Sequence, residues 1–85
     1  MKNPLDSVRS SMIEAESGLY LVALELRRIP FSVDTRELHL RALQLKREVA
    51  GWARHAPNAA ARDATIEEID RLRERVCAYR GLACA

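Results

Sequence analysis

The first third of the chain carries apolar or small residues at alternating intervals of three and four. The series is unbroken and comprises Leu5, Val8, Met12, Ala15, Leu19, Val22, Leu26 and Ile29. A mean spacing of about 3.5 residues places all of them on one stripe of an α-helix, as in a helix that packs lengthwise against another. The pattern therefore predicts a helical packing module with a coiled-coil-like seam, and it indicates no particular chemistry.

Local signals mark both ends of this first helix. Asn3 can cap it and Pro4 suits the first helical position, whereas Pro30 opposes its continuation. We therefore expect a helix over about residues 4–29. Gly18 interrupts its interior at a cost of about 1 kcal/mol relative to alanine, and its lack of a side chain would permit a neighbour to approach closely.

A second helix is expected over about residues 35–55. Asp34 and Glu37 have capping-box spacing, with Asp in place of the usual Ser or Thr. The apolar beat that follows is formed by Leu38, Ala42, Leu45, Val49, Trp52 and Ala56. Because the link from the first helix is short, the two helices are predicted to form an antiparallel hairpin.

A third helix is expected over about residues 65–80. Thr65 and Glu68 form a capping box, although Asn58 could cap an earlier start. Its apolar positions are Ile66, Ile69, Leu72, Val76 and Tyr79, and Gly81 would follow its last turn. The fold class predicted for the single domain 1–85 is therefore all-α: a helical hairpin with a shorter third helix, a three-helix bundle expected to be oligomeric.

Apolar residues beside the seams form the candidate partner-binding site. We define this predicted band as Tyr20, Leu21, Leu24, Leu40, Leu43 and Arg47. If the hairpin turn centres near Ser32, the aliphatic members lie at one height near that turn. Two interpretations stay open, because the third helix or another chain could cover the band. An amphipathic partner helix with acidic flanks would suit the outer stripe of the second helix.

Composition narrows the class of protein. An apolar content of 48% and a charged content of 31% exclude a disordered chain, and no apolar run reaches the roughly 18–20 residues that span a bilayer. No secretory signal is visible, so we expect a cytoplasmic protein that does not bind membranes. The strong excess of arginine over lysine is typical of a GC-rich bacterial genome. A net charge of +2 gives no electrostatic argument for nucleic acid.

No motif indicates a metal or a cofactor. His39 and His55 lack ligand spacing, and the two cysteines do not form a Cys-x-x-Cys pair. Within one continuous helix, the seven residues from Cys77 to Cys84 would span roughly 10 Å, too far for a disulfide. Gly81 could turn the chain between them and permit a bridge, which a reducing compartment would oppose. We therefore expect Cys77 to be a small core residue and Cys84 to be a thiol in the C-terminal tail.

No nucleophile has an identifiable base, and no glycine-rich phosphate loop is present, so we expect the chain not to be an enzyme. The favoured function is a non-enzymatic protein–protein interaction module: an adaptor, an assembly factor or an export-type chaperone that binds an amphipathic helix. Two alternatives stay open. One is a nucleic-acid-binding regulator that uses Arg36, Arg41, Lys46, Arg47 and Arg54. The other is a small helical enzyme whose cationic pocket draws on Arg27, Arg28, Lys46 or Arg47.

Overall fold

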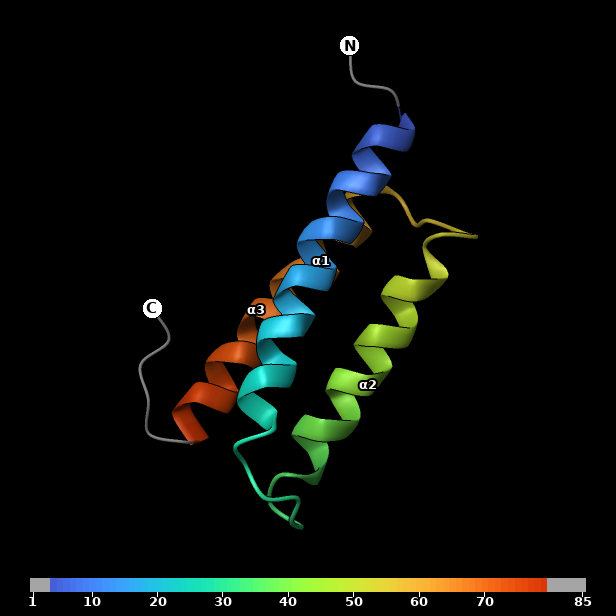
Figure 1. Cartoon of the computed structure of the whole chain (residues 1–85). Coiled ribbons are helices and arrows are strands. Elements are labelled where there is room, and N and C mark those ends of the chain that lie inside the picture. Colours follow the sequence, from blue (N-terminus) through green and yellow to red (C-terminus); the bar gives the residue numbers. More distant parts are fainter. Residues whose placement is uncertain (1–3, 80–85) are drawn as a thin grey trace.

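The structure is a computed structural model that describes residues 4–79, with side chains from residue 6 onward. It contains the helices α1 (Pro4–Leu26), α2 (Arg36–Gly51) and α3 (Ala59–Tyr79), and the described residues form no strand. The chain descends along α1, returns along α2 and descends again along α3, so that α2 is antiparallel to both other helices (Figure 1). The all-α, three-helix prediction is confirmed.

Most of the predicted apolar seams form the core where the three helices meet, whereas Ala56, which lies beyond α2, and Tyr79 are exposed. In α1 the seam is buried from Ala15 to Ile29, while Val8 and Met12 are half-buried and the side chain of Leu5 lies outside the described set. The other helices and the residue after α2 contribute Leu38, Leu45, Val49, Trp52, Ile66, Ile69, Leu72 and Val76. Burial of these apolar side chains, each large one worth about 1.5–3 kcal/mol, is what holds the helices together.

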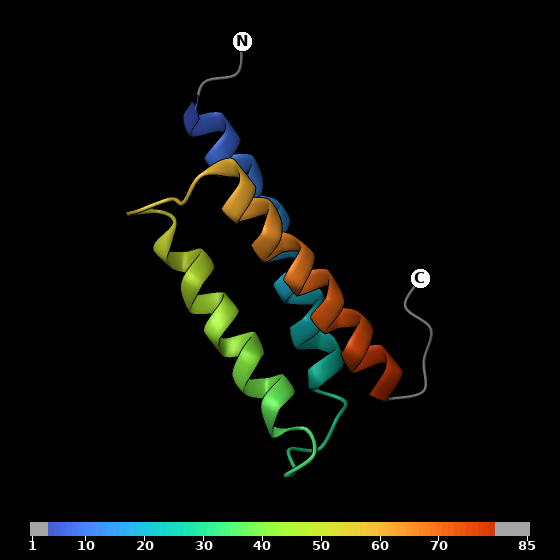
Figure 2. The same cartoon turned by 180° about the vertical axis from the view of Figure 1, so that it is seen from behind.

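α3 lies along α1 and is connected to it by polar as well as apolar contacts (Figure 2). The buried guanidinium of Arg62 donates hydrogen bonds to Ser7 Oγ and Ser11 Oγ of α1, both at 3.1 Å. It also donates one to the carbonyl of Pro57 at 2.6 Å. These bonds fix the first turns of α1 against the start of α3. They also offset the free-energy cost of burying the charged guanidinium of Arg62.

Polar side chains also connect α3 to α2. Arg41 donates two hydrogen bonds to Glu68, one from Nε and one from Nη2, the latter at 2.6 Å. The hydroxyl of Thr65 lies 3.3 Å from Glu48 Oε1. α3 is therefore attached by hydrogen bonds to both of the other helices.

The observed ends of α1 and α2 differ from the prediction. α1 ends at Leu26 because the backbone then tightens: the N–H groups of Arg28 and Ile29 bond three residues back before Pro30. α2 begins after Thr35, so the Asp34–Glu37 capping box is wrong. Thr35 is fully buried, and its hydroxyl donates to the Pro30 carbonyl and accepts the Ser32 N–H, both at 2.9 Å. It therefore organises the turn rather than capping the helix.

The predicted start of the third helix is also wrong. α3 begins at Ala59, where Asn58 Oδ1 accepts the N–H of Ala61 at 2.8 Å. Thr65 stands inside the helix, 3.2 Å from the Ala61 carbonyl. With 21 residues against 16 for α2, α3 is not the short helix that was expected. Gly81 lies outside the described residues.

Candidate functional site

An open groove runs between α1 and α2. It consists of two adjoining hollows, of about 410 Å³ near the α1–α2 turn and about 580 Å³ near the α2–α3 loop, and no α3 residue lines either. The turn-side hollow is lined by Glu16, Leu19, Tyr20, Ala23, Arg27, Lys46, Val49 and Ala50. The loop-side hollow is lined by Val8, Arg9, Met12, Ile13, Glu16, Trp52, Ala53, Arg54 and Ala56. Glu16 belongs to both, so we treat them as one α1–α2 groove.

The apolar lining of the groove combines buried large residues, such as Leu19, Val49 and Trp52, with four exposed alanines. Ala23 comes from α1 and Ala50 from α2, while Ala53 and Ala56 follow α2. Alanine favours the helix but fills little space, so α1 and α2 can pack at their seam and still leave a depression above it. The groove therefore presents a mainly apolar surface between its charged residues.

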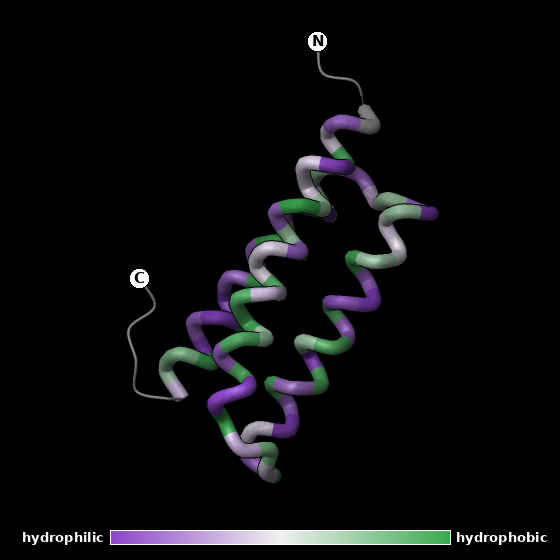
Figure 3. The backbone as a smooth tube through the Cα atoms, viewed as in Figure 1, coloured by the Kyte–Doolittle hydropathy of each residue, from purple (hydrophilic) through white to green (hydrophobic). Residues whose placement is uncertain are grey.

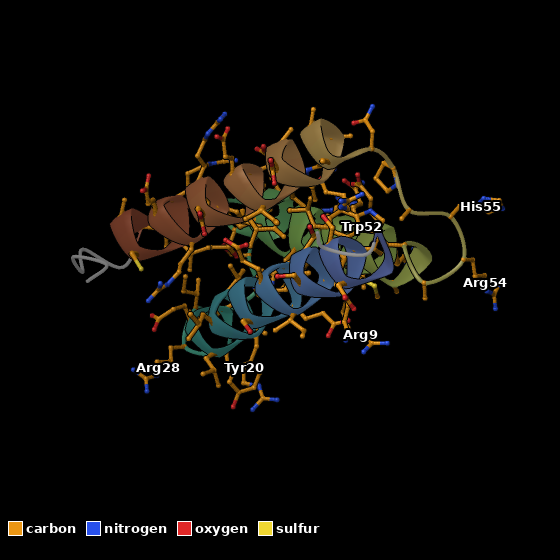
Figure 4. The ribbon with its side chains drawn as sticks, turned by 90° about the horizontal axis from the view of Figure 1, so that it is seen from above. Arg9, Tyr20, Arg28, Trp52, Arg54 and His55 are labelled. Atoms are coloured by element: carbon orange, nitrogen blue, oxygen red, sulfur yellow. The ribbon has the colours of Figure 1, made fainter. Side chains whose placement is uncertain are left out.

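The rim of the groove is predominantly basic. Arg27 and Lys46 line the turn-side hollow, and Arg9 and Arg54 line the loop-side hollow, with Glu16 between the two pairs. Among the described residues, none of these four basic side chains makes an ion pair. Figure 4 shows Arg9 and Tyr20 projecting from α1 away from α3, and Arg54 projecting from the segment after α2.

The predicted band is divided among several surfaces. Tyr20 lines the groove and is 64% exposed. Leu21, at 38% exposure, lines a shallow hollow on α1 together with Tyr20 and Ile13, both of which also line the groove. Leu24 is half-buried. These residues share a helix, but only Tyr20 and Ile13 lie where α1 faces α2.

The members of the band on α2 lie away from the groove. Leu40 and Leu43 are each 44% exposed and Arg47 is exposed. Leu40 lines a separate hollow on α2 with Val33, whereas Leu43 and Arg47 line neither hollow of the groove. α3 therefore leaves most of the band accessible, and the structure does not unite it into one surface.

The chain matches no family model, no curated protein and no solved structure. In the part of the chain that is described, no helix combines the length and apolar character needed to cross a membrane.

Sequence reasoning missed two exposed apolar residues at the end of the bundle. Phe31 is 68% and Val33 92% exposed in the α1–α2 turn, where the hydropathy colouring shows apolar segments (Figure 3). Neither belongs to a helical repeat, so periodicity could not single them out. Phe31 does pack on His39 of α2, with ring centroids 5.2 Å apart.

The described residues offer little for metal or nucleophilic chemistry. They contain no group of three or more His, Cys, Asp or Glu side chains that could hold a metal ion. Cys77 is a core residue, as predicted, but it is disulfide-bonded. Of the two states that the sequence left open for Cys77, the structure has the disulfide. The distance argument against it holds only for one helix through both cysteines, and the described part of α3 ends at Tyr79. Cys84 lies outside the described residues.

The clearest electrostatic coupling has a structural role. The hydrogen bonds from Arg41 hold the pKa of Glu68 below its ordinary value, and the same bonds raise the pKa of Arg41. The pair connects α2 to α3 on a side of the bundle that the groove does not reach. It stabilises the frame of the groove and contributes no charge to its rim.

Proposed function

We propose that this chain is a non-enzymatic protein–protein interaction module that binds an amphipathic helix of another protein. The observation that carries the proposal is the α1–α2 groove, an apolar trough between two antiparallel helices with a third helix only on its far side. An amphipathic helix placed there would complete a four-helix arrangement. Adaptors, assembly factors and export-type chaperones are the classes of protein that use such a surface.

Exposed apolar side chains beside the trough support this function. Ile13 and Tyr20 are more than half exposed although both line the groove. Burying a side chain of this size contributes roughly 1.5–3 kcal/mol, and an aromatic ring near the centre of an interface is a frequent source of binding energy. A protein helix with apolar residues every three or four positions would bury both.

A synthetic amphipathic peptide of about five turns tests the proposal. We expect it to bind with an affinity that Tyr20→Glu lowers at least tenfold, since the substitution buries a charge in the interface. Leu43→Glu is the matched control, because Leu43 is exposed on the same bundle but lies outside the groove. Circular dichroism checks that both variants keep their helicity.

The result can contradict the proposal in two ways. No binding of any amphipathic peptide to the native chain would remove it. Loss of binding in Leu43→Glu with no effect of Tyr20→Glu would move the interaction to the outer face of α2, where the predicted band continues.

A further inference from the structure

We infer that the partner helix is acidic near both ends and neutral or basic at its centre. This inference rests on the proposed function and adds the charge pattern of the partner. It follows from the order of charges along the groove, which is basic at the turn-side hollow, acidic at Glu16 and basic again at the loop-side hollow.

The excess of basic over acidic residues is proportionally larger in the groove than in the chain as a whole. Its lining holds four basic side chains and one acidic one, whereas the whole chain has 14 basic and 12 acidic residues. Three acidic side chains outside the groove are paired with arginines, in Arg41–Glu68, Arg71–Glu67 and Arg75–Glu37. The basic residues of the rim form no ion pair within the described residues, so their charge is available to an acidic partner.

The basic residues contributed by α1 and its C-terminal end set the length of the partner. Arg9 lies in α1 and Arg27 directly follows it, and their separation of 18 residues corresponds to a helical rise of about 27 Å, or about five turns. Lys46 and Arg54 on the other wall lie closer together, eight residues apart. Carboxylates on the first and last turns of a bound helix would reach both pairs, while its apolar stripe covers the alanines between them. A lysine or glutamine midway would face Glu16.

The same charges argue against a second copy of this chain as the occupant. A two-fold dimer through the groove would bring two identical rims together and double the basic excess instead of neutralising it. The inference therefore favours a different protein over self-association at this face.

Three peptides of one amphipathic design separate the possibilities. The first carries Glu near both ends and Lys at the centre, the second carries Gln at all these positions, and the third reverses the charges of the first. We expect the first to bind about tenfold more tightly than the second at low salt, the difference shrinking as salt screens the rim, and the third to bind most weakly.

Substitutions in the protein provide the reciprocal test. Lys46→Gln should weaken binding of the Glu peptide severalfold and leave the Gln peptide unchanged. Arg36→Gln is the matched control, since Arg36 is exposed on α2 but lies outside the groove. Neither substitution alters the apolar lining of the groove.

Each failure has its own signature. Equal affinity for the Glu and Gln peptides would overturn the charge inference and leave helix binding intact, whereas no binding of any peptide would overturn the proposed function itself. A single-stranded oligonucleotide that displaces the Glu peptide and binds more tightly would overturn the inference in favour of a phosphate backbone.

Discussion

Gly18 of α1 and Ile69 of α3 are so close that a Cβ on Gly18 would lie 2.8 Å from Ile69 Cγ2. Ile69 is 1% exposed, so its branched methyl group has nowhere to move. We expect Gly18→Ala to destabilise the chain by about 1 kcal/mol, because overpacking of about 1–3 kcal/mol outweighs the gain in helix propensity of about 1 kcal/mol. Urea unfolding followed by circular dichroism measures the change.

Two further variants isolate the contact. Gly51→Ala places its methyl group where no atom lies within 4 Å, so it should be neutral or stabilising. In an Ile69→Ala background the clash is gone, and Gly18→Ala should then become stabilising. Destabilisation of equal size in both backgrounds would contradict the close contact.

The buried guanidinium of Arg62 gives a second prediction. Arg62→Lys keeps the charge but cannot reach Ser7, Ser11 and the Pro57 carbonyl together, so we expect a loss of about 1–3 kcal/mol. Hydrogen exchange should rise in the first turns of α1. The matched control is Arg71→Lys, whose exposed pair with Glu67 contributes at most a few tenths of a kcal/mol. Equal effects of the two substitutions would show that the buried bonds do not stabilise the fold.

Periodicity predicted the helices and most of the core, because burial repeats with the helical period. It could not choose between Asn58 and Thr65 as the cap of the third helix, since both are good capping residues. The structure decides through tertiary contacts: Thr65 packs in the core beside Glu48, which leaves Asn58 to begin the helix.

The site was less predictable than the fold. Large apolar residues off the seam were identifiable, but the face that stays open depends on where α3 packs. α3 covers the side of α1 that carries Gly18 and Ser11, so the groove forms on the side that carries Ala23. Small residues such as Ala23 and Ala50 give no sign in the sequence that they line a groove.

The Arg41–Glu68 pair predicts a dependence of stability on pH. Because the folded pKa of Glu68 is below its ordinary value of 4.5, the stabilising contribution is fully present above pH 4.5. It is lost as the pH falls through the lower, folded pKa. The difference in unfolding free energy between the native chain and Glu68→Gln should therefore be at most about 1 kcal/mol at neutral pH and should vanish in acid.

Glu67→Gln serves as the control for that measurement. Its pair with Arg71 is more exposed than the pair between α2 and α3, so its removal should cost less at neutral pH. A difference for Glu68→Gln that stays constant down to strongly acidic pH would contradict the assignment.

The disulfide of Cys77 predicts that its sulfur is protected from alkylation by the covalent bond as well as by burial. In protein denatured without a reductant, we expect Cys77 to resist alkylation, and after reduction we expect it to react fully. Peptide mapping by mass spectrometry distinguishes the two states. Alkylation of Cys77 in denatured but unreduced protein would contradict the disulfide.

The redox state of Cys77 inside the cell would indicate the compartment in which the protein resides. Disulfides persist in oxidising compartments and are rare in the reducing cytoplasm. Thiols trapped with an acid quench in living source cells report the state of Cys77 before lysis. An oxidised Cys77 in those cells would contradict the cytoplasmic expectation and favour an extracytoplasmic partner helix, whereas a reduced Cys77 would agree with the cytoplasmic expectation and contradict a disulfide inside the cell.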